Sequence, residues 1–171
     1  MRRRYPTNKP GSLLQYDSLR ASALEGDKGF ATRCMNPANN TSATLNDDAV
    51  SVYLAMEPVA ASRPRVSKWG TFYAEPYQSF LAAAPEVLHA LELPMLDGPL
   101  AVQLEVVCTK PKTSKLDLPR QDVDNFAKSI LDGLTKAGAW LDDAQVARLT
   151  VEKRFALKGE AAHTRIEIKA L

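Results

Sequence analysis

The sequence is poor in cysteine and histidine, with two of each among its 171 residues. Cys34 and Cys108 lie far apart and form neither a Cys-x-x-Cys pair nor a cysteine–histidine pattern. This argues against a disulfide framework and against a zinc site. The sequence also lacks a glycine-rich phosphate-binding loop and an internal repeat. Both cysteines are therefore expected to be ordinary thiols in a reducing compartment.

Long hydrophobic runs are absent as well. No segment approaches the roughly 18 apolar residues of a membrane span, and the basic start MRRRYPTNKP is followed by no apolar signal-peptide stretch. We therefore expect a cytoplasmic protein with no membrane contact. The formal net charge is only +2, so any case for a polyanionic partner must come from local clusters of charge.

Residues 1–48 show no sustained hydrophobic period and include the polar run NPANNTSATLNDD. They are predicted to form a polar N-terminal extension that is partly disordered. The remaining residues, 49–171, have clear periodicity and are predicted to form the folded domain.

Within that domain, apolar and polar residues alternate over 50–57 and 100–108, which predicts two half-buried strands. Between them, EPYQSFLAAAPEVLHALEL has helical spacing, with Pro85 expected to kink the helix or to start a second one. A further helix is predicted at about 125–136. The segments VARLTVEKRFAL and HTRIEIKAL predict two final strands, paired as a C-terminal hairpin. This order favours an α+β fold: a two-layer sandwich in which two helices cover one face of a small mixed sheet of about four strands.

One segment, QDVDNFAKSILDGLTKAGAWLDDAQV, places two aspartates before a single apolar helix and two after it. Asp124 is predicted to be the N-cap of this helix, because an apolar stripe follows and Gly138 can end it. Asp122 is harder to explain as structural. Residues two apart in an extended segment point to the same side, so Asp122 and Asp124 are expected to converge before the helix. Two such carboxylates repel unless a cation or proton lies between them.

Lys128 lies four residues after Asp124, where it can reach the same space or form an ordinary surface ion pair. Asp142 and Asp143 can likewise be explained as turn residues before the next strand. Together, these acids are oxygen ligands without nearby histidine or cysteine, which favours Mg²⁺, with Mn²⁺ as an alternative. Such a site supports phosphodiester hydrolysis, in which Lys128 stabilises charge developing on the phosphate.

Distance along the chain leaves two arrangements of this site open. A helix of ~12 residues is roughly 18 Å long, and the link from Gly138 to Asp143 spans at most roughly 17 to 18 Å when extended. Asp143 can therefore only just return to Asp122 and Asp124 within one chain. The alternative is that Asp143 completes a site from the second subunit of a dimer.

The acidic segment resembles the core of the RusA family of Holliday junction endonucleases, small phage-derived resolvases. A DxDN element, a lysine four residues after its second aspartate, a helix and LDDAQV follow in the family's order. The segment RPRVSKWGTFYAEPY also resembles the family's N-terminal element, so the likeness runs from about residue 50 to the end. It implies that Asp122, Asp124 and Asp143 bind the catalytic metal and that Lys128 is essential, while the role of Asp142 is less clear.

The resemblance further implies a homodimer, a divalent metal, and paired nicks in opposed strands of a four-way DNA junction, in a bacterial host cell and from a phage or prophage gene. The same motifs fit a nuclease of broader branched-DNA or flap specificity. A junction-binding protein that has lost catalysis is a rival of another class. Residues 1–48 have no counterpart in short family members.

Basic residues gather in RPRVSK and in TKPKTSKLDLPR, directly upstream of the acidic motif. A carboxylate site alone would repel DNA, so cations beside it favour contact with phosphates over a merely solvated loop. Four aromatic residues near the first cluster, Trp69, Phe72, Tyr73 and Tyr77, are expected to pack in the core more than to stack on bases. The candidate DNA contacts are Arg63, Arg65, Lys68, Lys110, Lys112, Lys115 and Arg120.

Overall fold

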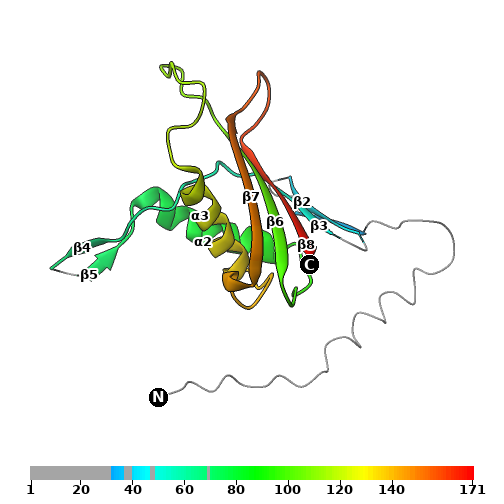
Figure 1. Ribbon diagram of the computed structural model, residues 1–171. Helices are drawn as coiled ribbons and strands as arrows, with labels where there is room; N and C mark the ends of the chain where they lie inside the picture. Colours follow the sequence, from blue (N-terminus) through cyan, green and yellow to red (C-terminus); the bar gives the residue numbers. More distant parts are fainter. Residues whose placement is uncertain (1–31, 37–39, 47–48, 69) are drawn as a thin grey trace, which may run out of the picture. The chain divides into compact units, whose positions relative to one another are not determined.

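A six-stranded sheet and two helices on one of its faces make up most of the described chain (Figure 1). The computed structural model describes residues 32–36, 40–46, 49–68 and 70–171, all within the unit Ala31–Leu171. The sheet consists of β1 (Thr32–Asn36), β2 (Thr41–Leu45), β3 (Val50–Leu54), β6 (Leu100–Cys108), β7 (Val146–Phe155) and β8 (His163–Ala170). Its strand order is β1-β2-β3-β8-β6-β7, in which only β6 and β7 run parallel. The predicted α+β, two-layer arrangement is confirmed, with six strands in place of about four.

The core lies between the sheet and the two helices, α2 (Glu75–His89) and α3 (Val123–Lys136). Alternate residues of β3, β6 and β8 point to this side, as the period of two requires. Trp140, just after α3, is 1% exposed, and its indole Nε1 donates a hydrogen bond to Thr135 Oγ1 over 2.7 Å. The helical contribution to the core comes mainly from Phe80, Ala84, Leu88, Phe126, Ile130 and Leu134.

The last two strands are not paired with each other, so the predicted C-terminal hairpin is wrong. β6, α3 and β7 form a parallel crossover unit, which places β7 beside β6 at the edge of the sheet. β8 then pairs antiparallel with the other side of β6 and with β3. Hydrophobic periodicity predicts that a segment is a strand but does not state its neighbour, which here is set by the crossover helix.

Two further expectations differ from the structure. Pro85 neither ends α2 nor starts a second helix, since the helix continues through it to His89. The sheet also begins before residue 49, because β1 and β2 come from the segment predicted to be a polar extension, and Thr41 and Ala43 of β2 are buried. Residues 1–31, 37–39 and 47–48 of that predicted extension lie outside the described residues. No helix in the described part of the chain is long and apolar enough to cross a membrane.

A small hairpin of β4 (Arg65–Ser67) and β5 (Gly70–Phe72) precedes α2. Figure 1 shows it projecting beyond the start of that helix. Gly70 has a φ of +130°, a conformation that side chains other than glycine rarely adopt, and it closes the turn of the hairpin. The structure thus carries the RPR segment outward, away from the main sheet.

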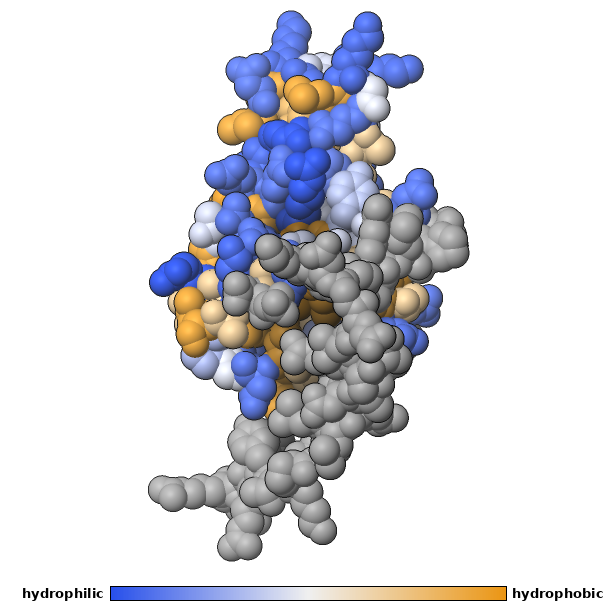
Figure 2. All heavy atoms as spheres, turned by 90° about the vertical axis from the view of Figure 1, so that its right-hand side faces the viewer, coloured by the Kyte–Doolittle hydropathy of each residue, from blue (hydrophilic) through white to orange (hydrophobic). Residues whose placement is uncertain are grey.

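The sheet face away from the helices is polar, and Figure 2 shows hydrophilic side chains over much of its visible upper part. A network of ion pairs crosses three strands there. Arg154 of β7 contacts Glu105 of β6 at 2.8 Å and Glu160 at 2.7 Å, and Arg165 of β8 contacts Glu105 at 3.1 Å. This network ties the parallel edge strand to the centre of the sheet.

Replacing Glu160 with glutamine is expected to make the protein less stable at neutral pH but not in strong acid. The hydrogen bond from Arg154 lowers the pKa of Glu160 from its ordinary value of 4.5 to about 2. A carboxyl with a depressed pKa stabilises the fold above its unfolded pKa and loses that contribution as the pH falls through its folded pKa. The difference in melting temperature between the two proteins should therefore shrink between about pH 4.5 and pH 2. Glu152→Gln on β7, for which no ion pair is recorded in the described part, is the control; a pH-independent difference for Glu160→Gln would contradict the ion-pair origin.

Candidate functional site

The start of α3 presents two exposed carboxylates. The helix begins at Val123, with Asp122 as its N-cap residue (φ −68°, ψ 144°) and Asp124 in its first turn. The prediction that Asp124 is the N-cap is therefore wrong, as is the idea that the two acids share an extended segment. The Asp122 side chain makes no capping hydrogen bond, although N-cap aspartates commonly accept one. No side-chain partner is recorded for Asp122 or Asp124 among the described residues, so both carboxylates are available to an external cation.

Lys128 lies one turn further along α3, but its ammonium is not directed to Asp124. Its Nζ is 3.2 Å from Oδ1 of Asp132, one turn towards the C-terminus. The other carboxylate oxygen of Asp132 accepts a hydrogen bond from the hydroxyl of Tyr77 over 2.6 Å. The sequence did not indicate this contact between Tyr77 and Asp132, because only the packing of α2 against α3 brings the two residues together.

Asp142 and Asp143 lie after the other end of α3, at η1 (Asp143–Gln145). Asp142 is the N-cap of this turn and accepts a hydrogen bond from the backbone N–H of Ala144 over 2.8 Å. The Gln145 side chain completes a capping box and also donates to the carbonyl oxygens of Leu96 and Gly98. Asp142 thus has a structural task, while Asp143 is exposed on a turn that is anchored at both ends.

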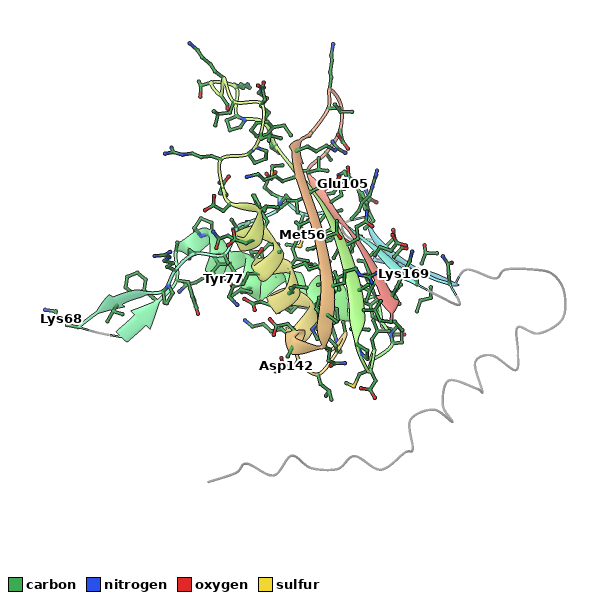
Figure 3. All side chains as sticks on the ribbon, viewed as in Figure 1. Met56, Lys68, Tyr77, Glu105, Asp142 and Lys169 are labelled. Atoms are coloured by element: carbon green, nitrogen blue, oxygen red, sulfur yellow. The ribbon has the colours of Figure 1, made fainter. Side chains whose placement is uncertain are left out.

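The two acidic groups lie far apart within one chain. α3 has 14 residues, which is about 21 Å of helix. Asp122 begins it, whereas Asp142 lies near its far end (Figure 3). The length of β7 gives the same result. Its first residue, Val146, directly follows η1. Near its other end, Lys153 donates a hydrogen bond to the backbone oxygen of Gln121, the residue before Asp122. Seven residue steps of strand separate Val146 from Lys153, or about 23 Å.

The described residues of a single chain contain no group of three or more His, Cys, Asp or Glu side chains that could hold a metal ion. The structure therefore does not bring Asp122, Asp124 and Asp143 together within one subunit. Asp122 and Asp124 alone still suit a hard divalent cation, because Mg²⁺ is often held by one or two carboxylates together with waters and substrate phosphates. Asp143 of the same chain lies too far away to act as a third ligand beside them.

Four of the predicted DNA contacts lie on one loop, residues 109–122, which leads from β6 to the start of α3. Lys110, Lys112, Lys115 and Arg120 are all exposed on it. The Lys110 ammonium also lies 5.4 Å from the centre of the Phe155 ring. Lys153 adds a cation beside Gln121 that the sequence prediction did not include. The carboxylates at the start of α3 therefore follow directly on a basic loop.

The other predicted contacts lie on or near the β4–β5 hairpin. Arg63 and Lys68 are exposed, and Lys68 is at the outer tip of the hairpin (Figure 3). The side chain of Arg65 lies outside the described set, as does Trp69. Of the other aromatics, Phe72 and Tyr73 are 44% and 40% exposed, while Tyr77 is buried and packs edge to face on Tyr73 at 5.2 Å. Among the described aromatic residues of this group, Tyr77 packs in the core as expected, whereas Phe72 and Tyr73 are exposed.

The fold and the site together define a small α+β protein in which an acidic helix start adjoins a basic loop. Residues 55–169 match the family Endodeoxyribonuclease RusA, which is more than half of the chain. The chain belongs to the RusA family. Proteins named crossover junction endodeoxyribonuclease RusA from Escherichia coli strain K12, Shigella sonnei strain Ss046 and Enterobacteria phage 82 are each 46% identical to it over 67 residues. These residues make up 38% of this chain and 52% of each relative, so the chain spans about half the length of the curated relatives it matches.

Proposed function

We propose that this protein is a metal-dependent endonuclease that acts as a homodimer on four-way DNA junctions and nicks opposed strands in pairs. Membership of the RusA family and the names of the three relatives support this substrate. One relative comes from a phage, which supports the further proposal that the protein is encoded by a phage or prophage and works in the cytoplasm of a bacterial host.

The observation that carries the proposal is the start of α3, where the Asp122 and Asp124 side chains have no recorded partner among the described residues. An N-cap aspartate that does not cap leaves an N–H group of the helix to other partners, at a typical cost of ~1 kcal/mol. A carboxylate used in this way is better explained by a ligand than by stability. The basic loop 109–122 supports the choice of ligand, because it offsets the repulsion between the acids and DNA phosphates.

A two-fold dimer supplies the missing third carboxylate. Asp122 and Asp143 lie near opposite ends of α3 and β7, so a two-fold axis that crosses the middle of β7 exchanges these ends. Asp143 of the partner subunit then approaches Asp122 and Asp124, and the same happens at the second site. β7 is an edge strand of the sheet. Two apolar side chains of this region are exposed: Leu149 on β7 (42%) and Leu141 between α3 and η1 (72%). We therefore infer that the α3–β7 side forms the dimer interface.

In this arrangement Asp122, Asp124 and Asp143 of the partner subunit would hold Mg²⁺ or Mn²⁺. A bound ion of this kind neutralises phosphate charge and makes water a better nucleophile near neutral pH. Lys128 has a side chain that is 60% exposed, so a phosphate oxygen can reach its ammonium, which stabilises the charge developing there. Asp142 and Gln145 fix the turn that presents Asp143.

The exposed cations of loop 109–122, with Arg63, Arg65 and Lys68, are proposed to follow the phosphate backbone of the junction arms. Such contacts hold DNA without reading its sequence. Selectivity for four-way junctions then depends on the shape of the dimer and on DNA deformation rather than on base contacts. The dimer offers two equivalent basic loops, one for each site, as paired nicks require.

Replacing Lys112 and Lys115 together with alanine should weaken binding to junction and duplex DNA alike. Each lysine that neutralises a phosphate contributes about 1 to the slope of log Kd against log salt concentration. The double variant should therefore lower that slope by about 2, measured by fluorescence anisotropy between low and physiological salt. Lys169→Ala, which removes a cation paired with Glu167 on β8, should leave the slope unchanged. An unaltered slope in the double variant would remove this loop from the DNA-binding surface.

The experiment that tests the proposed function is cleavage of an end-labelled four-way junction beside a matched linear duplex and a flap. Each substrate is incubated with Mg²⁺, with Mn²⁺ and with EDTA. Symmetric nicks confined to the junction and abolished by EDTA are the expected result. Equal cleavage of flap and junction would instead establish a broader branched-DNA nuclease, and tight junction binding without cuts would establish a binding protein.

A further inference from the structure

Lys128 has two acidic neighbours at helical spacing, Asp124 four residues before it and Asp132 four residues after it. The pair with the acid on the N-terminal side is normally the better one, because helical side chains lean towards the N-terminus. The structure has the opposite pair, with Lys128 Nζ 3.2 Å from Asp132 Oδ1. No ion pair to Asp124 is recorded in the described part of the chain. Lys128 therefore pairs with the acid that the helix alone disfavours, and the cause lies outside α3.

Tyr77 of α2 provides that cause. Its hydroxyl donates a hydrogen bond to Asp132 Oδ2 over 2.6 Å, and the tyrosine itself is 3% exposed. Burial and the bond to Asp132 raise the pKa of Tyr77 well above its ordinary value, so it remains a donor at any physiological pH. The Asp132 side chain is only 25% exposed. It is thus a fixed and partly desolvated partner, whereas Asp124 is exposed and has no such anchor.

Whether Lys128 pairs with Asp132 or with Asp124 determines how well the acids at the start of α3 can bind a cation. An ammonium on Asp124 would neutralise that carboxylate and compete with any metal cation for its oxygens. With Lys128 held by Asp132, its ammonium does not occupy the oxygens of Asp124. We propose that Asp132, anchored by Tyr77, is a positioning residue that keeps Lys128 off Asp124 and so preserves the carboxylate pair for a divalent cation. This inference rests on the proposed function, since it takes Asp122 and Asp124 to be cation ligands.

The test is a double-mutant cycle read by Mn²⁺ binding to the full-length protein, measured by titration calorimetry without DNA. Asp132→Asn should weaken Mn²⁺ binding roughly 1.4- to 5-fold, the factor that corresponds to redirecting an exposed ion pair of about 0.2–1 kcal/mol. In a Lys128→Met background the same substitution should have little effect, because no ammonium is left to move. An equal effect in both backgrounds would mean that Asp132 acts only through its own charge, which would overturn the inference.

Tyr77→Phe provides a charge-neutral version of the experiment. It removes the hydroxyl that anchors Asp132 and should also weaken Mn²⁺ binding, and this effect too should disappear with Lys128→Met. Tyr73→Phe is the matched control, since Tyr73 packs on the Tyr77 ring but has no recorded bond to Asp132. Thermal unfolding of each variant checks that the fold is retained.

A metal-free crystal structure of Asp132→Asn supplies a second readout, in which Lys128 Nζ should lie within ion-pair distance of Asp124. A lysine that stays away from Asp124 would overturn the inference. The failure of the inference and that of the proposed function are distinguishable. Unchanged Mn²⁺ affinity in the Asp132 and Tyr77 variants would overturn the positioning role alone, while absence of Mn²⁺ binding by the unsubstituted protein would overturn the metal site and the positioning role with it.

Discussion

Asp122→Asn is expected to abolish junction cleavage while leaving the fold and junction affinity intact. Asparagine is as good an N-cap residue as aspartate, and Asp122 makes no capping hydrogen bond that the change would break. What is lost is one carboxylate ligand of the proposed metal. Metal-assisted stabilisation of phosphate charge is worth several kcal/mol, so the rate should fall by at least about 100-fold.

The measurement pairs single-turnover cleavage of a labelled junction with anisotropy binding of the same DNA. Binding should be equal or slightly tighter, because a negative charge near the phosphates has been removed. Asp117→Asn is the matched control: Asp117 is exposed on the same loop, five residues earlier, and belongs to no part of the proposed site. Retention of cleavage by Asp122→Asn, or parallel loss of binding and cleavage, would remove Asp122 from the proposed metal site.

The periodicity of the sequence predicted β3, β6, α2 and α3 because each carries a regular apolar face that must be buried. It failed at β1 and β2, whose short polar sequences form strands because β3 offers an edge to β2 and β2 in turn offers one to β1. It also failed to state that β6 separates β7 from β8. Pairing depends on where the chain crosses the sheet, and no local pattern contains that information.

For the candidate site as well, the local pattern indicated candidate residues but not which of them meet in space. The acidic motif grouped Asp122, Asp124, Asp142 and Asp143. The family resemblance implied that three of them, Asp122, Asp124 and Asp143, bind the metal, but spacing alone left their meeting point open. The three-dimensional structure places Asp143 with η1, past the far end of α3 from the other two. Contacts between helices were inaccessible to sequence reasoning, and the partner of Lys128 was therefore missed. That partner is Asp132, which is anchored by Tyr77, a residue 51 positions before Lys128.

The separation of the acids leads to a sharper expectation for mixed dimers. If each site combines Asp122 and Asp124 of one subunit with Asp143 of the partner subunit, a dimer of one Asp122→Asn chain and one Asp143→Asn chain has both defects in one site. Its other site is intact. Each homodimer alone should be inactive, whereas the verified heterodimer should regain cleavage and make single nicks rather than paired ones.

Mixing Asp122→Asn with Asp124→Asn chains is the control that the geometry provides. Both residues belong to the same end of α3, so each site of that heterodimer keeps one defect and no activity should return. Differently tagged subunits, purified through both tags, ensure that only heterodimers are assayed. Recovery in the first mixture and not in the second requires a site shared between subunits, because a site built within one chain is defective in every subunit of both mixtures. Failure of the first mixture to recover would place the third ligand somewhere other than Asp143 of the partner subunit.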